Sequence, residues 1–244
     1  MINHKQSFLT ALQFLTTLPV KLSEPIDAKN QGYSLVYYPL IGLIIAGILL
    51  MTIFSLQSQS SWVISSLTLT VWVVLTGALH LDGLADSADA WLGGLGNKDK
   101  TLTIMKDPAS GPIAVITLII ILLVKFVMLA ELIQQQQWIS ILAAPVLARS
   151  ALPLLLITTP YVRQAGLAST LVNNLPLQPT KKMLLLVGVI ALFTVKLLPL
   201  FLLLLLFLLL RHYMIERLGG MTGDTAGAML ELLETSALLL FIIF

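Results

Sequence analysis

Three aspartates at helical spacing are the strongest chemical feature of this 244-residue sequence. Asp82, Asp86 and Asp89 fall at positions i, i+4 and i+7, which places their side chains on one face of a helix. Carboxylates so placed repel each other unless a cation or hydrogen-bond donors lie between them. Because hard cations such as Mg²⁺ take oxygen ligands, the stripe predicts a metal or phosphate-handling site, with all three aspartates as metal ligands and Asp82 and Asp86 also as catalytic candidates. The alternative is a solvated acidic helix end at a membrane surface.

Two neighbouring features extend this candidate site. His80 precedes the stripe and is a catalytic candidate that orients an aspartate or donates to a phosphate, with a structural role as the alternative. Further along, Lys106 and Asp107 lie in a tight loop that ends at Pro112, a residue suited to the first turn of a helix. A helix N-terminus binds anions readily. We expect Asp107 to act as metal ligand or catalytic group and Lys106 to contact phosphate; the alternative is a turn with a helix cap.

A glycine-rich segment, GGMTGDTAGA at residues 219–228, is the third element. It leads into Glu231 and Glu234, and charges in a lipid-spanning helix cost about 2.5–3.5 kcal/mol each at mid-membrane. We therefore predict a buried polar face rather than a surface turn with snorkelling glutamates. Thr222 or Asp224 is a candidate helix cap. The site candidates here are Asp224 as catalytic group and metal ligand, and Gly220, Thr222, Gly223 and Glu231 as substrate-binding residues.

Composition shows what kind of protein must position these groups. Hydrophobic residues make up 57% of the chain and charged residues 11%, against about 25% charge in soluble domains. This excludes an ordinary soluble or disordered protein. The absence of cysteine excludes disulfides and iron–sulfur clusters, and a net charge of +2 gives no reason to expect a nucleic-acid partner. Long apolar runs such as residues 197–210 favour helices over a barrel.

The predicted fold is all-α: a polytopic membrane helix bundle forming a single integral membrane domain over residues 1–244. A span needs about 20 apolar residues. The N-terminal stretch 7–20 is interrupted by polar residues and proline, so we expect a half-helix or interfacial segment there. In residues 183–215 we predict a hairpin turning at 196–199, with one long tilted helix as the alternative. The seven predicted spans are about 34–55, 62–80, 112–133, 139–159, 183–196, 198–215 and 226–244.

The connections alternate in charge. Residues 57–61 and 134–137 carry no charge, whereas the other connections hold eleven of the fourteen Lys and Arg residues. By the positive-inside rule, the N-terminus and the loops 81–111, 160–182 and 211–225 share the cytoplasmic side. The site is therefore expected at the cytoplasmic face of an inner membrane. The composition of residues 160–182 suggests an irregular segment over it.

Two basic residues lie within predicted spans, Lys125 and Arg149. Intramembrane charges usually face the bundle interior and pair with one another. One interpretation is structural pairing with Glu131 or with the aspartates. The other is that they bind substrate, holding phosphate oxygens or stabilising transition-state charge.

Taken together, these segments resemble the cobalamin-5′-phosphate synthase family. The resemblance rests on FLTTLP (14–19), YPLIG (38–42), HLDGLADSAD (80–89), IMKDPASG (104–111) and GGMTGDTAGA (219–228) with Glu231, in the family's order. It implies a Mg²⁺-dependent enzyme that joins adenosylcobinamide-GDP to α-ribazole 5′-phosphate or α-ribazole and releases GMP. Oligomeric state is left open, and a homo-oligomer is compatible with it.

Three other functions compete with this one. CDP-alcohol phosphotransferases also hold metal and a diphosphate with aspartates, but their Asp-Gly is followed by Ala-Arg, and Asp82-Gly83 is not. A cation transporter would spread its acids through several spans. A purely structural membrane subunit would not need so many intramembrane charges.

Overall fold

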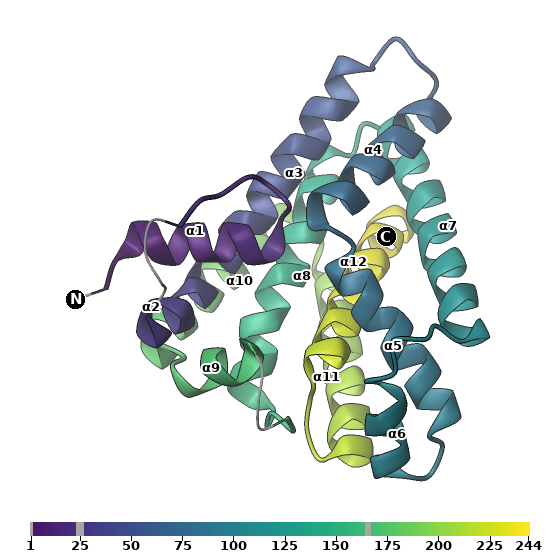
Figure 1. The fold of residues 1–244 in the computed structure, drawn as a ribbon. Helices are drawn as coiled ribbons and strands as arrows, with labels where there is room; N and C mark the ends of the chain where they lie inside the picture. The colour runs from purple at the N-terminus through teal and green to yellow at the C-terminus, as the bar shows by residue number, and fades with distance from the viewer. Residues whose placement is uncertain (1, 23–26, 164–166) are drawn as a thin grey trace.

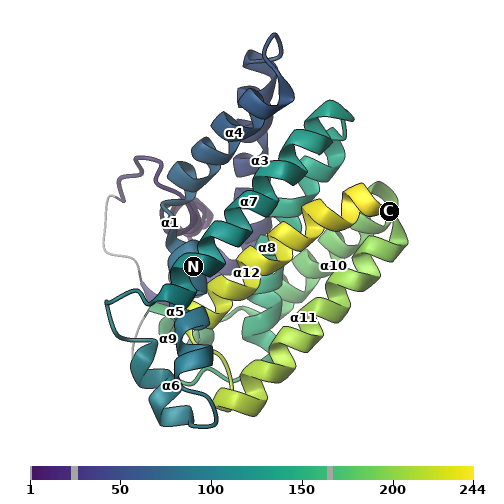
Figure 2. The ribbon, with the colours of Figure 1, turned by 90° about the vertical axis from the view of Figure 1, so that its right-hand side faces the viewer.

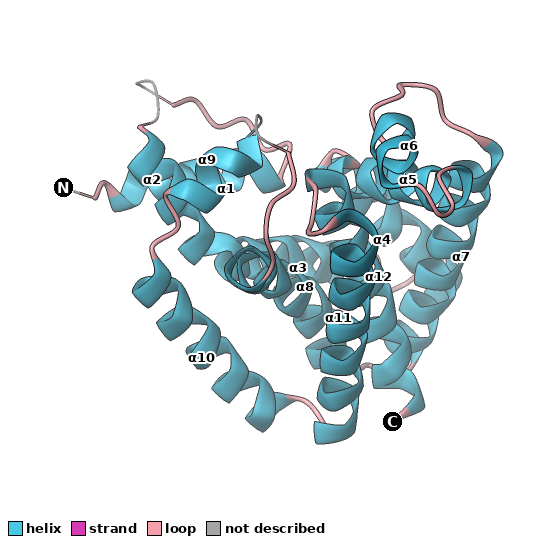
Figure 3. Ribbon diagram, turned by 90° about the horizontal axis from the view of Figure 1, so that it is seen from below, coloured by secondary structure: helices cyan, strands magenta, loops and turns pink. Residues whose placement is uncertain are grey.

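The computed structural model describes residues 2–22, 27–163 and 167–244, and its regular structure there is helical (Figure 3). Within these ranges, six helical segments are long and apolar enough to cross a membrane, or seven if a bent pair of helices counts as one span. They are Ala28–Ser55, made of α2 (Ala28–Tyr33), the 3-10 turn η1 (Ser34–Tyr37) and α3 (Tyr38–Ser55), and then α7 (Pro112–Gln134), α8 (Trp138–Thr158), α10 (Leu177–Thr194), α11 (Leu197–Leu218) and α12 (Gly223–Ile243). The prediction of a polytopic helical bundle is confirmed.

The second predicted span is broken. α4 (Ser61–Thr76) and α5 (Leu79–Gly93) meet at an angle of 87°. The predicted span over 62–80 was therefore wrong at its C-terminal end, because the helix stops at Thr76 and the chain turns there. Gly77 and Ala78 both have left-handed backbone, with φ of 63° and 55°. Glycine adopts this conformation freely and ends helices with it, whereas alanine rarely does. The bend places His80 and the aspartate stripe on a separate helix.

The N-terminal half-helix is confirmed as α1 (His4–Leu15), which runs across the long helices (Figure 1). The residues after it hold the α4–α5 bend in place. The backbone N–H of Thr17 donates to the carbonyl of Leu75 at 2.8 Å, and its hydroxyl donates to that of Val74 at 2.9 Å. These carbonyls belong to the last turn of α4, whose C=O groups lack partners within the helix. The FLTTLP string therefore fixes the bend.

The predicted hairpin between the fifth and sixth spans is also confirmed. α10 ends at Thr194 and α11 begins at Leu197, so that only Val195 and Lys196 lie between the two helices (Figure 2). The break comes slightly before the predicted 196–199, because Pro199 is tolerated in the first turn of α11. An apolar cavity of about 590 Å³ lies between α8, α10 and α11.

The connections at the two ends of the bundle differ. Figure 2 shows the uncharged α3–α4 and α7–α8 turns at one end, with α6 (Lys98–Ile104), α9 (Leu167–Asn173) and the α11–α12 connection at the other. Figure 1 shows the same division. Most basic residues therefore lie at the end that carries the short helices.

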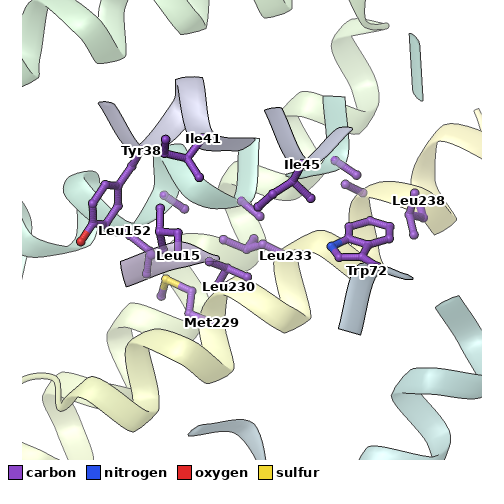
Figure 4. Packing of buried hydrophobic residues seen from close by; sticks show 14 of the residues in the cluster. Leu15, Tyr38, Ile41, Ile45, Trp72, Leu152, Met229, Leu230, Leu233 and Leu238 are labelled. Carbon is purple, nitrogen blue, oxygen red and sulfur yellow. The ribbon is translucent and has the colours of Figure 1, made fainter. Parts of the chain in front are cut away.

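The core lies where α1, α3, α8 and α12 converge (Figure 4). Leu15, Ile41, Leu152 and Leu230 pack there, and Trp72 of α4 lies at the other end of the same cluster, beside Leu238. Gly42 makes the α3–α8 contact close, since a Cβ there would lie 2.6 Å from the carbonyl oxygen of Pro145. Large apolar side chains on the outer faces of α7 and α11 are exposed, as expected of surfaces that contact lipid.

Candidate active site

Two glycines let α5 and α12 cross in direct contact. A Cβ on Gly83 would lie 2.8 Å from the carbonyl oxygen of Asp224, and one on Gly227 would lie 3.3 Å from the Cα of His80. Larger residues at either position would push the helices apart. The small residues of the aspartate stripe thus bring Asp82 next to Asp224, although 142 positions separate them in the chain.

Asp82 and Asp224 share a cavity of about 290 Å³ at this crossing. One part of its wall is polar, and much of the rest is formed by apolar side chains of α1, α8 and α9. The polar or charged lining residues are Tyr38, His80, Asp82, Tyr161, Arg163, Thr222 and Asp224. A partly enclosed cavity with a few convergent polar groups is the usual form of a small-molecule site.

The glycine-rich segment forms one side of the cavity by pairing with the chain after α8. The N–H of Met221 donates to the carbonyl of Pro160 at 2.8 Å, and the N–H of Val162 donates to that of Met221 at 2.9 Å. Gly220 is required here because a Cβ would lie 2.2 Å from the Pro160 oxygen. This pairing fixes the position of Arg163, the next residue along.

Arg163 neutralises part of the acid cluster. One guanidinium nitrogen lies 2.6 Å from a carboxylate oxygen of Asp224, and both side chains are partly exposed to the cavity. Burial raises the pKa of the neighbouring Tyr161 hydroxyl, an effect that Arg163 opposes and Asp224 reinforces. Tyr161 therefore stays a neutral donor. Sequence reasoning did not place Arg163 in the site; the available signal was its position in the irregular 160–182 connection.

Asp86 belongs to the same cluster. Its carboxylate interacts electrostatically with Asp82, Asp224 and Asp89, and with Arg163. Three carboxylates thus stand against one guanidinium around the cavity, since Asp89 is engaged elsewhere. Among the described residues, no three acidic or histidine side chains are close enough to enclose a metal ion by themselves. A cation bound here therefore needs further ligands from water or from a substrate.

Asp89 has a different role in this structure. One of its carboxylate oxygens accepts from the N–H of Ala114 at 2.9 Å, and the other accepts from the N–H of Gly111. These groups belong to the first turn of α7, so Asp89 caps that helix and stabilises its positive end. Gly111 permits the approach, because a Cβ would lie 2.8 Å from the carboxylate.

The loop between α6 and α7 does not reach the cavity. Asp107 and Lys106 are both exposed, and neither lines it. The Asp107 carboxylate accepts from the N–H of Ala109 at 3.0 Å, which supports the turn of the alternative interpretation; the helix cap itself is supplied by Asp89. Their roles as metal ligand, catalytic group and phosphate contact stay predictions.

The charges buried in the spans form a separate network. The ammonium of Lys125 on α7 lies 2.6 Å from carboxylate oxygens of both Glu231 and Glu234 on α12, and Arg149 on α8 pairs with Glu234. The buried polar face of α12 is therefore confirmed. The structural pairing of Lys125 and Arg149 is confirmed, but the expected partners, Glu131 or the aspartates, were wrong: the Glu131 carboxylate accepts from the amide of Gln135 at 2.6 Å instead. Substrate contacts by Lys125, Arg149 and Glu231 stay predictions.

His80 and Thr222 lie between these groups. His80 is 4% exposed and contributes to the cavity wall, and its Nδ1 has no hydrogen-bond partner among the described residues. The hydroxyl of Thr222 accepts from the N–H of Thr225 at 3.2 Å, and the Thr225 hydroxyl accepts from the N–H of Thr222 at 2.9 Å. This reciprocal cap starts α12, so the capping role considered for Thr222 is confirmed.

Fold and site together define a polytopic α-helical membrane protein with an acidic cavity at the end of the bundle that carries its basic connections. Comparison with known sequences makes this specific. The chain belongs to the cobalamin-5-phosphate synthase family, whose profile matches residues 7–242. The resemblance seen in the sequence strings is confirmed.

Its relatives match over nearly their whole length. An adenosylcobinamide-GDP ribazoletransferase of Pseudomonas fluorescens (strain Pf0-1) is 48% identical over 231 residues, covering 93% of this chain and 95% of the relative. The protein of the same name from Stutzerimonas stutzeri (strain A1501) is 50% identical over 232 residues, covering 94% and 95%. No solved structure matches the chain.

Proposed function

We propose that this protein joins adenosylcobinamide-GDP to α-ribazole 5′-phosphate or α-ribazole and releases GMP, a late step of cobalamin biosynthesis. The observation that carries the proposal is the match over nearly the whole chain to relatives named for this activity. In the reaction a ribazole hydroxyl attacks the phosphorus bonded to cobinamide. The bond from that phosphorus to the bridging oxygen breaks, GMP leaves, and the hydroxyl proton passes to a base.

The aspartates at the acidic cavity fit Mg²⁺ as the cofactor. Asp82 and Asp224 line the cavity, and Asp86 lies near enough to both to interact with them electrostatically. Mg²⁺ is usually held by one or two carboxylates together with water and substrate phosphates. When bound, the ion would neutralise charge on the diphosphate and on the departing GMP. Asp89 and Asp107 are weaker candidates because their carboxylates accept backbone N–H groups.

The chain's own residues perform the remaining tasks. Arg163 is placed to exchange Asp224 for a phosphate oxygen, because a guanidinium binds both anions well. A cavity carboxylate, Asp82 or Asp224, is the base that takes the proton of the attacking hydroxyl. The apolar wall formed by Phe14, Leu152 and Leu156 excludes water, which limits hydrolysis of the diphosphate.

The direct test is an assay of the purified protein in detergent with both substrates and Mg²⁺, followed by separation of nucleotides. GMP release that requires α-ribazole phosphate supports the proposal, and CMP release from a CDP-alcohol would favour the phosphotransferase alternative. Asp82→Asn should lower kcat about 10²–10³-fold, the usual cost of losing a group that stabilises transition-state charge. Asp99→Asn, an exposed aspartate on α6, is the matched control and should turn over normally. Equal turnover rates for the two variants would show that Asp82 does not act in catalysis.

We further propose that the protein lies in the inner membrane with this cavity on the cytoplasmic side. The cavity is lined in part by the α11–α12 connection, which lies at the end of the bundle where most basic residues lie. Basic connections usually stay in the cytoplasm. The C-terminus should then lie outside the cytoplasm, so a reporter that works only there should be active when fused after Phe244. Activity of a reporter that works only in the cytoplasm would show the opposite orientation.

A further inference from the structure

A second cavity of about 240 Å³ adjoins the acidic cavity. Its wall is formed by α1, α2, η1, α3 and α9. The lining residues are Thr10, Gln13, Phe14, Gln31, Ser34, Tyr38 and Leu171. Phe14, Tyr38 and Leu171 also line the acidic cavity, so the two hollows are adjoining compartments of one cleft.

The junction between the compartments is aromatic. The rings of Phe14 and Tyr38 are stacked, with centroids 6.2 Å apart and planes inclined by 21°. These residues begin the FLTTLP and YPLIG strings, and both line the two compartments. Flat apolar rings at this place suit a planar ring system of a ligand.

Two side-chain amides line the second compartment, that of Gln31, which is half-buried, and that of Gln13, which is exposed. Neither amide makes a hydrogen bond within the described residues, so both are open to a ligand, whereas the adjacent hydroxyls are occupied. Thr10 donates to the carbonyl of Gln6 at 2.8 Å, and Ser34 donates to that of Gln31 at 2.6 Å. An amide offers a donor and an acceptor side by side, the pattern that pairs with the edge of a purine base.

The frame around these amides is held by polar contacts. The N–H of Asn3 donates to the Asn30 side chain at 2.9 Å, and the Asn30 amide donates to the Gln6 side chain at 3.1 Å. On the other side α9 packs closely on α2, since a Cβ on Gly32 would lie 2.0 Å from the Asn174 carbonyl oxygen. The half-helix and α2 therefore form a preorganised wall, which reduces the entropic cost of binding.

We propose that this second compartment is the subsite for the guanine of adenosylcobinamide-GDP, with Gln13 and Gln31 as specificity-determining residues. The inference rests on the proposed function, which requires a guanosine diphosphate whose phosphates lie in the acidic cavity. Guanine has N–H donors and carbonyl and ring-nitrogen acceptors for both amides. The base of ribazole offers no N–H donor, so it cannot donate a hydrogen bond to the amide oxygens of Gln13 and Gln31.

Steady-state kinetics of Gln13→Ala and Gln31→Ala test the subsite. Each substitution should raise KM for adenosylcobinamide-GDP about tenfold, the effect of one ligand hydrogen bond, while kcat and KM for α-ribazole 5′-phosphate stay unchanged. Each should also reduce discrimination against the inosine analogue, which lacks the exocyclic amino group of guanine. Gln57→Ala is the matched control: Gln57 is exposed on the uncharged α3–α4 turn at the other end of the bundle.

A rise in KM for α-ribazole phosphate alone would assign the compartment to the ribazole base and overturn the proposal, as would unchanged kinetics. Equilibrium dialysis with GMP and Mg²⁺ separates this inference from the proposed function. If the wild type releases no GMP from the two substrates, the proposed function fails. The subsite is then still tested: about tenfold weaker GMP binding by the Gln13 and Gln31 variants than by Gln57→Ala supports it, and equal binding refutes it.

Discussion

Two groups of charged side chains lie only a few residues apart along α12, and their charges are balanced differently. In the membrane-embedded group, Glu231 and Glu234 face Lys125 and Arg149, so two anions meet two cations. At the start of the helix, Asp224 joins Asp82 and Asp86 with a single guanidinium, that of Arg163. The first group is neutral and closed; the second has excess negative charge and opens into a cavity.

This difference separates a structural role from a binding role. Buried charges persist when every one of them is paired, and the Lys125 network meets that condition by tying α7 and α8 to α12. Unbalanced carboxylates beside a cavity remain unfavourable until a cation arrives. Substitutions in the two groups should therefore affect different properties. Those in the first group should lower stability, and those in the second should lower activity and ligand binding.

The largest effect is expected in the neutral group. Glu234→Ala removes the partner of Arg149 and one of the two partners of Lys125, leaving uncompensated positive charge in the bundle. We expect a loss of about 3–5 kcal/mol in the free energy of unfolding. Thermal unfolding in detergent measures it, with Glu131→Ala, a partly exposed glutamate on α7, as the control. A melting temperature equal to that of the control would show that the network does not hold the bundle together.

A smaller effect is expected where the two helices cross. Gly83→Ala places a methyl group 2.8 Å from the Asp224 carbonyl oxygen, so α5 and α12 must separate. We expect a loss of about 1–3 kcal/mol in stability and a fall in activity, since Asp82 moves away from Asp224. Gly47→Ala is the control, because a Cβ at that position meets nothing within 4 Å. Full activity in Gly83→Ala would show that the close crossing is not needed.

The smallest effect is expected at the single cation of the acidic cavity. Arg163→Ala should raise KM for adenosylcobinamide-GDP about tenfold, because one charge-assisted contact to phosphate is lost. Arg163→Lys should recover part of this loss by keeping the charge. Substrate titrations of the two variants provide the measurement. If both variants have the KM of the wild type, Arg163 does not contact the substrate and its role is only the ion pair with Asp224.

Local sequence pattern predicted the features that depend on neighbouring residues. The runs of apolar residues located the spans, the interruption near Pro199 located the hairpin, and the i, i+4, i+7 spacing placed Asp82 and Asp86 on one face. The small residues between the aspartates predicted that another part of the backbone packs closely against this helix, and α12 does so at Gly83.

Features that depend on distant residues escaped prediction. The partners of Lys125 lie 106 and 109 positions away, and nothing in the local sequence distinguishes Glu231 and Glu234 from Glu131. The use of Asp89 as a cap for α7 depends on how α5 packs against that helix. The bend at Gly77–Ala78 is held by Thr17, which follows α1, through hydrogen bonds across 57 and 58 positions.

Mn²⁺ binding, followed by electron paramagnetic resonance, tests without turnover whether the aspartates of the acidic cavity bind a divalent cation. The purified protein should bind Mn²⁺ in the presence of GMP, and Mg²⁺ should displace it. An Asp82→Asn, Asp224→Asn double variant should lose this binding, while Asp99→Asn keeps it. Unchanged Mn²⁺ affinity in a folded double variant would show that these aspartates do not hold the cation.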